Sequence, residues 1–542
     1  MATSTLSSVP EPLAEETPPL VDEVAPASDA PIAGASAAGD VILSIKDLRT
    51  YFYTYDGVVK ALDGVTLKIR KGETTGLVGE TGCGKSVTAF SVTRLIADPP
   101  GRVMDGKIMF GGANLLWRLE TEAKFIPKPG TPRVKVRRKY SRVRAADIRM
   151  NSVRGRHIAM IFQEPSQAMN PVFSISNQLS EVLLLHRGIQ IIDSMLAART
   201  DGPEVAAAID AVVSATGRRQ REELIAAAKH LGEVTGSPSF GTEIYHTARG
   251  STPGADDLKP RILRAMKRLR LSPNQRRYLA YRRRRIDLQN RLAEVALDEM
   301  RSESPKNADR RRLQRKVFSE RLRHFYYGLW GIRSRIQRPL TVETFWRSVR
   351  LLEGVSIANP AQVARGYPHE LSGGMLQRVM IAMALSSDPD VLIADEPTTA
   401  LDVTIQAQIL ELMRDLKERV GTSILLITHD LAVIAEVADR VCVMYAGQIV
   451  EQGPVQDVFR RPLHPYAQGL LASIPRFDQP DKELQSIPGS VPNLITPPSG
   501  CRFHPRCPHA MPVCKGERPP VTVEGPEHTV ACYLYTGPVA AD

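Results

Sequence analysis

The sequence predicts an α/β fold built on a mostly parallel sheet, and three observations predict it. Short apolar runs recur along the chain, at 75–78, 158–162, 391–394, 424–428 and 441–444. Buried strands of this kind that alternate with helices are typical of a parallel sheet with both faces covered. The glycine-rich sequence GETGCGKS follows the first run and precedes a predicted helix at 86–96, which is the context that a phosphate-binding loop (P-loop) requires.

Two further strands are predicted before the loop, at 41–45 and 65–69, the second with clear alternation. At 542 residues the chain is too long for one small domain, and its 43% hydrophobic content is ordinary for a folded protein. No apolar run approaches the roughly 20 residues that cross a bilayer. A secretory leader is not expected, because residues near the start lack a basic segment followed by an apolar one. We therefore expect a cytoplasmic protein whose membrane role, if it has one, is exerted through partners.

Composition divides the chain into parts. Residues 1–39 are rich in Ala, Pro, Ser and Glu without apolar periodicity, so a disordered arm is expected. A nucleotide-binding domain is expected at 40–455, interrupted by basic insertions at about 118–148 and 190–345. A C-terminal extension is expected at 456–542.

The net charge of +12 is concentrated in one segment. Residues 255–350 hold 27 Lys and Arg against 10 Asp and Glu, so the rest of the chain is slightly acidic. Helices are expected at 203–234 and a loop at 236–254. Further on, apolar residues at steps of three, seven, four and three fit an amphipathic helix with a basic outer face. They are Tyr278, Tyr281, Leu288, Leu292 and Val295.

The residue types in the P-loop have chemical reasons. Gly79, Gly82 and Gly84 leave room for backbone N–H groups around phosphate oxygens, which a Cβ would obstruct. Lys85 supplies a charge for the β- and γ-phosphates of ATP, and Ser86 offers its hydroxyl to Mg²⁺. The helix that follows points its positive end at the anion.

Two carboxylates follow a predicted buried strand. Asp395 stands at the carboxyl end of that strand, where it can hold Mg²⁺ through the water shell of the ion. Glu396 would project toward the γ-phosphate, and we predict that it polarises the attacking water.

The segment Leu371, Ser372, Gly373 and Gly374 completes a series that few phosphate-binding proteins carry. The chain thereby resembles the nucleotide-binding subunits of ATP-binding-cassette (ABC) transporters. In that family the segment begins a helix whose N-terminus meets the γ-phosphate bound by the opposite subunit, which agrees with the affinity of helix N-termini for anions. The resemblance implies a dimer with shared ATP sites.

The resemblance extends to four other positions. Gln163 matches the Q-loop that senses Mg²⁺ and links to the membrane subunits, and Asp402 matches the D-loop. His429 matches the switch histidine that contacts the γ-phosphate. An aromatic residue at 51–55 should stack on adenine, and Phe52 is the predicted one.

Several segments narrow the likeness to the oligopeptide/dipeptide permease ATPases: 169–172, 367–370, 377–384, 398–404 and 487–494. The resemblance covers about 41–117, 150–188 and 350–535. It implies a subunit on the cytoplasmic face of the membrane that energises uptake of peptides or related small solutes. The implied partners are a second ATPase subunit (a paralogue), two transmembrane permease subunits and an extracytoplasmic solute-binding protein. The alternative is a soluble ABC ATPase acting on nucleic acid or ribosomes.

Four of the six cysteines lie in the C-terminal extension: Cys501, Cys507, Cys514 and Cys532. Disulfides are disfavoured in a reducing cytoplasm, so the cluster suggests a metal site. Some members of the resembled family hold a [4Fe–4S] cluster with such a tail, and four thiolates suit one. Zinc, with His504 and His509 as substitute ligands, and no bound metal at all remain alternatives.

The other two cysteines lie in the predicted core. Cys83 is inside the P-loop, where a thiol reagent is expected to block ATP. Cys442 lies in an apolar strand and is expected to serve packing.

The basic segment 255–350 admits several interpretations. Near a membrane it would attract anionic lipids at about 1 kcal/mol for each basic residue. A permease-binding or partner-binding arm, nucleic-acid binding and a solvated decoration are the alternatives. The sequence does not identify the solute, because ATPase subunits do not form the selective pocket.

Overall fold

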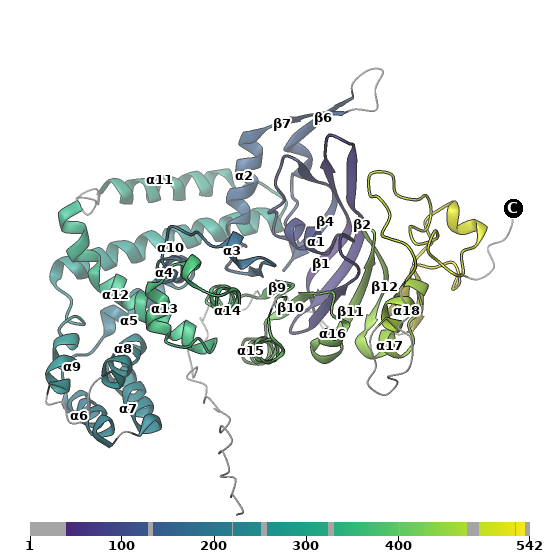
Figure 1. Cartoon of the computed structure of the whole chain (residues 1–542). Helices are drawn as coiled ribbons and strands as arrows, with labels where there is room; N and C mark the ends of the chain where they lie inside the picture. Colours follow the sequence, from purple (N-terminus) through teal and green to yellow (C-terminus); the bar gives the residue numbers. More distant parts are fainter. Residues whose placement is uncertain are drawn as a thin grey trace, which may run out of the picture.

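The computed structural model describes residues 40–127, 134–218, 220–250, 257–323, 330–399, 401–473, 487–525 and 527–536. The arm expected at 1–39 lies outside the described residues. Two sheets occupy the centre, most helices gather on one side of them, and the C-terminal segment lies on the other side (Figure 1). Within the described residues, no helix is long and apolar enough to cross a membrane.

The larger sheet has the strand order β13-β14-β12-β11-β3-β10-β9-β8. Its strands are β3 (Thr74–Val78), β8 (Ile158–Ile161), β9 (Val391–Asp395), β10 (Ser423–Ile427), β11 (Arg440–Tyr445), β12 (Gln448–Pro454), β13 (Thr522–Gly525) and β14 (His528–Val530). The strands predicted from apolar runs, β3 and β8 to β11, pair in parallel. The parallel core is therefore confirmed, since a strand covered on both faces needs an unbroken apolar run.

The smaller sheet is antiparallel, in the order β2-β1-β4-β5. Its strands are β1 (Val41–Tyr53), β2 (Val58–Arg70), β4 (Gly101–Phe110) and β5 (Ala113–Asn114). Leu43, Ile45 and Leu67 on its inner face join one buried apolar cluster with Val92 of α1 and Leu425 of β10. This cluster joins the smaller sheet to the larger one.

Helices follow the strands of the larger sheet, as predicted for an α/β core. They are α1 (Lys85–Val92), α14 (Gly373–Leu385), α15 (Val403–Val420), α16 (Leu431–Val437), α17 (Val455–Arg460) and α18 (Pro465–Ala472).

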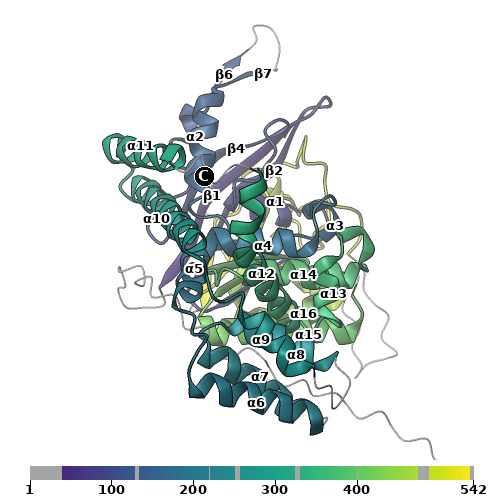
Figure 2. The ribbon, with the colours of Figure 1, turned by 90° about the vertical axis from the view of Figure 1, so that its left-hand side faces the viewer.

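The interval predicted as the larger insertion lies in a helical region with apolar clusters of its own. The helices of this region are α3 (Pro165–Ala168), α4 (Ile175–His186), α5 (Gly188–Ala197), α6 (Pro203–Arg218), α7 (Arg221–Val234), α8 (Pro238–Arg249), α9 (Leu258–Met266), α10 (Pro273–Arg301), α11 (Asn307–Arg323), α12 (Trp330–Gly354) and α13 (Pro360–Arg365). Helices α6 to α9 share one cluster, and α4, α5, α10 and α12 share another. Figure 2 shows α6 to α9 at one end of this region and α10 with α11 at the other.

The loop expected at 236–254 is wrong for most of its length, because α8 fills 238–249; residues 251–254 lie outside the described residues. Gly241 allows a close helix contact, since a Cβ there would lie 2.5 Å from the carbonyl oxygen of Ala228 on α7. Phe240 and Ile244, four positions apart, bury the same face of α8.

The amphipathic helix predicted in the basic segment is α10, but its buried stripe differs in part. Tyr278 and Tyr281 are buried as expected. The positions predicted further along, Leu288, Leu292 and Val295, are only half-buried. Residues such as Ile286, Leu297 and Met300 are buried instead.

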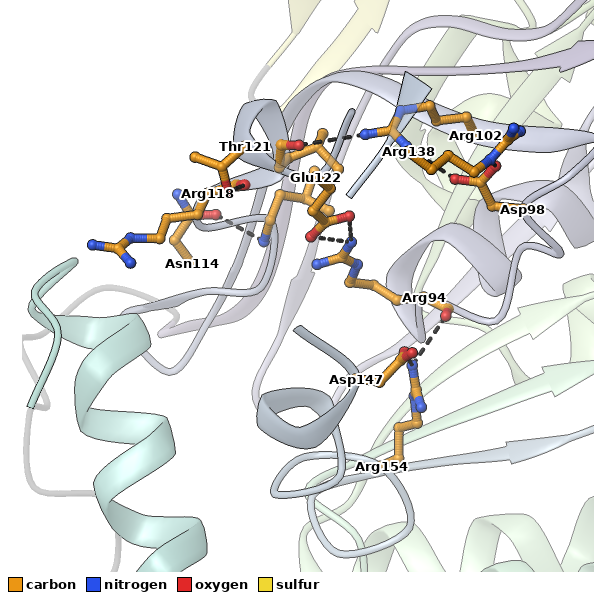
Figure 3. Close-up of polar contacts among 12 residues, drawn as sticks. Arg94, Asp98, Arg102, Asn114, Arg118, Thr121, Glu122, Arg138, Asp147 and Arg154 are labelled. Atoms are coloured by element: carbon orange, nitrogen blue, oxygen red, sulfur yellow. Dashed lines mark hydrogen bonds and ion pairs between the residues drawn. The ribbon is translucent and has the colours of Figure 1, made fainter. Parts of the chain in front are cut away.

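The interval predicted as the smaller basic insertion contains a hairpin, β6 (Ala123–Pro127) with β7 (Val134–Arg138), and helix α2 (Tyr140–Met150). Ion pairs tie it to the chain that follows α1 (Figure 3). Arg94 donates to both carboxylate oxygens of Glu122 at 2.8 and 2.7 Å. Asp98 accepts from Arg102 at 2.9 Å and from Arg138 on β7. Part of its basic character therefore serves local packing.

The C-terminal extension is joined to the larger sheet. Strand β14 pairs antiparallel with β12, and β13 pairs with β14. His528 on β14 lies 2.8 Å from the buried carboxylate of Glu451 on β12, Nε2 to Oε1. The extension is thus continuous with the core.

Candidate nucleotide site

The P-loop connects β3 to α1, and two of its glycines are required by close backbone approach. A Cβ at Gly79 would lie 2.2 Å from the carbonyl oxygen of Met444, and one at Gly84 would lie 2.7 Å from that of Ala61. Gly82 faces open space but has φ +82°, which favours glycine. At Gly79 and Gly84 the protein backbone itself excludes a Cβ.

Lys85, the first residue of α1, reaches back across the loop. Its Nζ donates to the carbonyl oxygens of Gly79 at 2.7 Å and of Glu80 at 3.2 Å. The side chain is held at the loop, as a lysine that binds phosphate must be.

Cys83 corrects a prediction. It is fully buried in the apolar cluster between the sheets, and burial raises the pKa of its thiol. Since the thiolate is the reactive form, a thiol reagent is not expected to block ATP here. Cys442 is buried in the same cluster, which confirms its packing role.

Ser86 and Asp395 come together as the sequence predicted. The Oγ of Ser86 donates to Oδ1 of Asp395 at 3.1 Å. Among the described residues, nothing hydrogen-bonds the buried Oδ2 of Asp395, and burial raises the pKa of this carboxyl to about 6. A buried carboxylate oxygen without a partner, beside a hydroxyl, fits Mg²⁺, which prefers oxygen ligands.

Glu396 is surrounded by three polar side chains from separate segments. Its Oε2 accepts from Nε2 of Gln163 at 2.9 Å and from Oγ1 of Thr399 at 3.0 Å, while Nδ1 of His429 lies 3.3 Å from Oε1. Gln163 follows β8, Glu396 follows β9 and His429 follows β10. These neighbouring parallel strands end at one edge of the sheet, where ligands bind in open α/β folds.

The environment keeps Glu396 ionised. Burial raises its pKa, but hydrogen bonds from His429 and Thr399 and the charge of Lys85 lower it more, so the net pKa lies below its ordinary value. An ionised carboxylate next to a candidate magnesium site can accept a hydrogen bond from water and polarise it. The sequence missed Thr399, although its place three residues after Glu396, in a turn, was a signal.

The segment that begins at Leu371 is exposed. Ser372 is the N-cap of α14, its Oγ accepting from the backbone N–H of Met375 at 3.4 Å. Ser372 and Gly373 face solvent, and a Cβ at Gly373 would meet nothing within 4 Å. Asp402 caps α15 by accepting from the N–H of Ile405 at 2.8 Å. A helix N-terminus is therefore presented at the surface.

Phe52 lies on β1 and is half-buried. A Cβ at Gly101 on the neighbouring strand β4 would lie 2.7 Å from its ring. The ring thus packs over the glycine backbone.

The four cysteines of the extension line one small cavity, together with His504 and His509. Burial raises the pKa of Cys501, Cys507 and Cys532, the last to about 11. Within the described residues, no group of three or more His, Cys, Asp or Glu side chains is arranged to hold a metal ion. The predicted metal centre is therefore not confirmed.

Comparison with known proteins gives two family matches. Residues 62–235 and 264–399 match the family described as ABC transporter, and residues 450–514 match Oligopeptide/dipeptide transporter, C-terminal region. The chain belongs to the ABC transporter ATP-binding proteins of the oligopeptide/dipeptide type. It is an ATPase. The ABC transporter match leaves out residues 236–263, which lie inside the interval predicted as the larger insertion.

Three relatives of this ABC ATPase align with it along most of their length. The chain is 33% identical over 494 residues to the oligopeptide transport ATP-binding protein AppD of Bacillus subtilis, covering 91% of this chain and 97% of AppD. It is 31% identical over 493 residues to the dipeptide transport ATP-binding protein DppD of the same organism, covering 91% and 94%. It is 31% identical over 499 residues to the oligopeptide transport ATP-binding protein OppD of Salmonella typhimurium, covering 92% and 95%.

Proposed function

We propose that this chain is the ATP-hydrolysing subunit of an importer for peptides or related small solutes. The observation that carries the substrate class is the match of residues 450–514 to the oligopeptide/dipeptide transporter C-terminal region, which lies outside the catalytic core. The relatives, named as oligopeptide and dipeptide transport proteins, support it. They lend no support to the alternative, a soluble ABC ATPase acting on nucleic acid or ribosomes.

Reconstitution tests this function. We expect the chain to lie at the cytoplasmic face of the membrane, and for the test it is co-purified with two permease subunits and a second ATPase subunit. The complex should hydrolyse ATP faster when a peptide-loaded binding protein is added. Stimulation by RNA, without any effect of peptide or binding protein, would contradict the proposal.

The site supports these catalytic roles. Lys85 binds the phosphates, Ser86 and Asp395 hold Mg²⁺ with Gln163 nearby, and the ion supplies charge compensation at the γ-phosphate. Glu396 is held in position by Gln163, Thr399 and His429, and its carboxylate polarises the attacking water. Phe52 stacks on adenine.

The exposed start of α14 supports a second ATPase subunit as partner, and we propose that this subunit is a paralogue. Leu371 to Gly374 would close over the γ-phosphate bound by that subunit, with Asp402 beside the contact. Leu401 lies next to Gly374, 3.2 Å from where its Cβ would be, so the two surface segments form one patch. Ser372→Arg should block ATP-dependent association in analytical ultracentrifugation; association at unchanged affinity would exclude this interface.

We propose that the four cysteines lining the cavity hold a [4Fe–4S] cluster, with zinc as the alternative. Four thiolates suit such a cluster, because it binds one thiolate at each of its four irons. Cys501, Cys507 and Cys532, whose thiol pKa values are raised by burial, would lose their protons on binding iron.

Elemental analysis of anaerobically purified protein tests the cluster. We expect iron and acid-labile sulfide in equal amounts, and their loss in Cys532→Ser. Zinc in their place, or no metal, would refute the cluster.

The basic helices α10 and α11 support contact with anionic lipid. Arg276, Arg277 and Arg284 on α10 and Arg311 and Arg312 on α11 are exposed. Vesicle pelleting at two salt concentrations tests this. Binding to anionic vesicles should fall with salt and on replacing these arginines with Gln; equal binding to neutral vesicles would contradict it.

A further inference from the structure

The P-loop is held from outside by two residues of the C-terminal part. The backbone N–H of Glu80, the second residue of the loop, donates to the Oη of Tyr466 at 2.8 Å. The carboxylate of Glu80 accepts from Nη1 and Nη2 of Arg506 at 2.8 and 3.0 Å. The backbone and the side chain of Glu80 are therefore both held by side chains about 400 positions away in the sequence.

Arg506 is itself fixed. Its Nε donates to the carbonyl oxygen of Pro488 at 2.8 Å, and Nη1 donates to the Oη of Tyr445 at 3.3 Å. The arginine side chain is only 7% exposed. Bidentate hydrogen bonds between a buried arginine and a carboxylate are among the stronger hydrogen bonds in proteins, whereas ion pairs at the surface contribute little to stability.

The same two residues adjoin the cysteine cavity. Cys507, next to Arg506, and Pro465, next to Tyr466, both line it. The rings of Tyr445, Tyr466 and Phe503 pack on one another between the cavity and the P-loop, with centroids 4.7 to 5.4 Å apart. A change at the cavity wall therefore has a short, packed route to Glu80.

We infer that Arg506 and Tyr466 position the P-loop for ATP, and that the cysteine cavity acts on ATP affinity through them. This role goes beyond the proposed function, because it depends neither on the transported solute nor on which metal the cavity binds.

The first test compares Arg506→Gln with Glu80→Gln in the full-length chain, by titrating a fluorescent ATP analogue. Positioning predicts that both variants weaken ATP binding about tenfold, with the double variant no weaker than either, because they break one contact. A purely electrostatic effect predicts opposite signs, since the first leaves a carboxylate at the phosphate site and the second removes one. Opposite signs, or additive losses, would overturn the inference.

Glu527→Gln is the matched control. Glu527 also pairs the extension with the core, through Arg70 and Arg440, but does not touch the P-loop. Its ATP affinity should equal that of the wild type. An equal loss in this variant would mean that general loosening of the extension, and not positioning, explains the Arg506 result.

The second test asks whether the cavity acts through Arg506. Cys514→Ala, or Cys507→Ser if the first variant does not fold, is titrated in the wild-type and Arg506→Gln backgrounds. ATP affinity should fall in the wild-type background and hardly change further in the other. Equal losses in both, or none in either, would overturn the coupling, whereas the iron content measured separately decides the cluster proposal.

Discussion

The nucleotide site and the cysteine cavity are held together in different ways. Gln163, Glu396 and His429 follow adjacent parallel strands, so backbone ladders bring them to one sheet edge. The cysteines lie mostly on irregular chain, anchored to the core by side chains such as Arg502 and Arg506. Geometry set by a ladder tolerates side-chain changes nearby, whereas geometry set by a few buried ion pairs does not.

The largest expected effect breaks such an anchor. Arg502→Ala removes a 4% exposed arginine that donates to Asp63 and to the carbonyl oxygen of Ala446, and should lower the free energy of unfolding by about 3–5 kcal/mol. Arg49, 48% exposed and 3.8 Å from the same Asp63, is the matched control, and Arg49→Ala should cost less than about 1 kcal/mol. Denaturant unfolding measures both; equal costs would contradict the comparison.

The next effect concerns Asp395, whose pKa is raised to about 6 by burial. The folded carboxyl holds its proton more tightly than the unfolded one. Its contribution to the free energy of unfolding is therefore fully present at low pH and is lost as the pH rises through about 6. Asp395→Asn should therefore stabilise the nucleotide-free protein by up to about 3 kcal/mol at pH 8 and by less at pH 5. Thermal melts at both pH values check the sign, and a gain that grows toward low pH would refute it.

Lys85→Ala should weaken ATP binding about 10- to 100-fold, because charged hydrogen bonds to the phosphates are lost. Lys71→Ala, at an exposed lysine before β3, should bind as the wild type does. Calorimetric titration distinguishes them. Unchanged binding in Lys85→Ala would remove the lysine from the site.

The smallest effect is expected for Thr399→Ala, which removes one neutral hydrogen bond to Glu396. Turnover should fall about fivefold, as expected for about 1 kcal/mol. A loss as large as that from replacing Glu396 would mean that Thr399 itself contacts the reacting atoms.

The parallel part of the larger sheet was predicted well from the sequence. Buried parallel strands require unbroken apolar runs, so β3 and β8 to β11 could be recognised, and with them the polar residues at their carboxyl ends. The contact between Ser86 and Asp395 follows from the same pattern.

The remainder depended on contacts that leave no local signal. Nothing near Glu80 indicates Tyr466 or Arg506, because the pairing arises only when the extension folds back. The burial of Cys83 was missed because its position in the P-loop motif does not show that its side chain packs into the apolar cluster between the two sheets. Helix α8 was missed because Gly241, a helix breaker by propensity, serves a close helix contact.

The most direct test of the central claim, that Glu396 polarises the attacking water, is single-turnover hydrolysis by Glu396→Gln. ATP binding is measured on the same sample. We expect ATP to bind as tightly as in the wild type, hydrolysis to fall about 10²- to 10⁴-fold, and an ATP-bound dimer to accumulate. Hydrolysis near the wild-type rate would contradict the assignment.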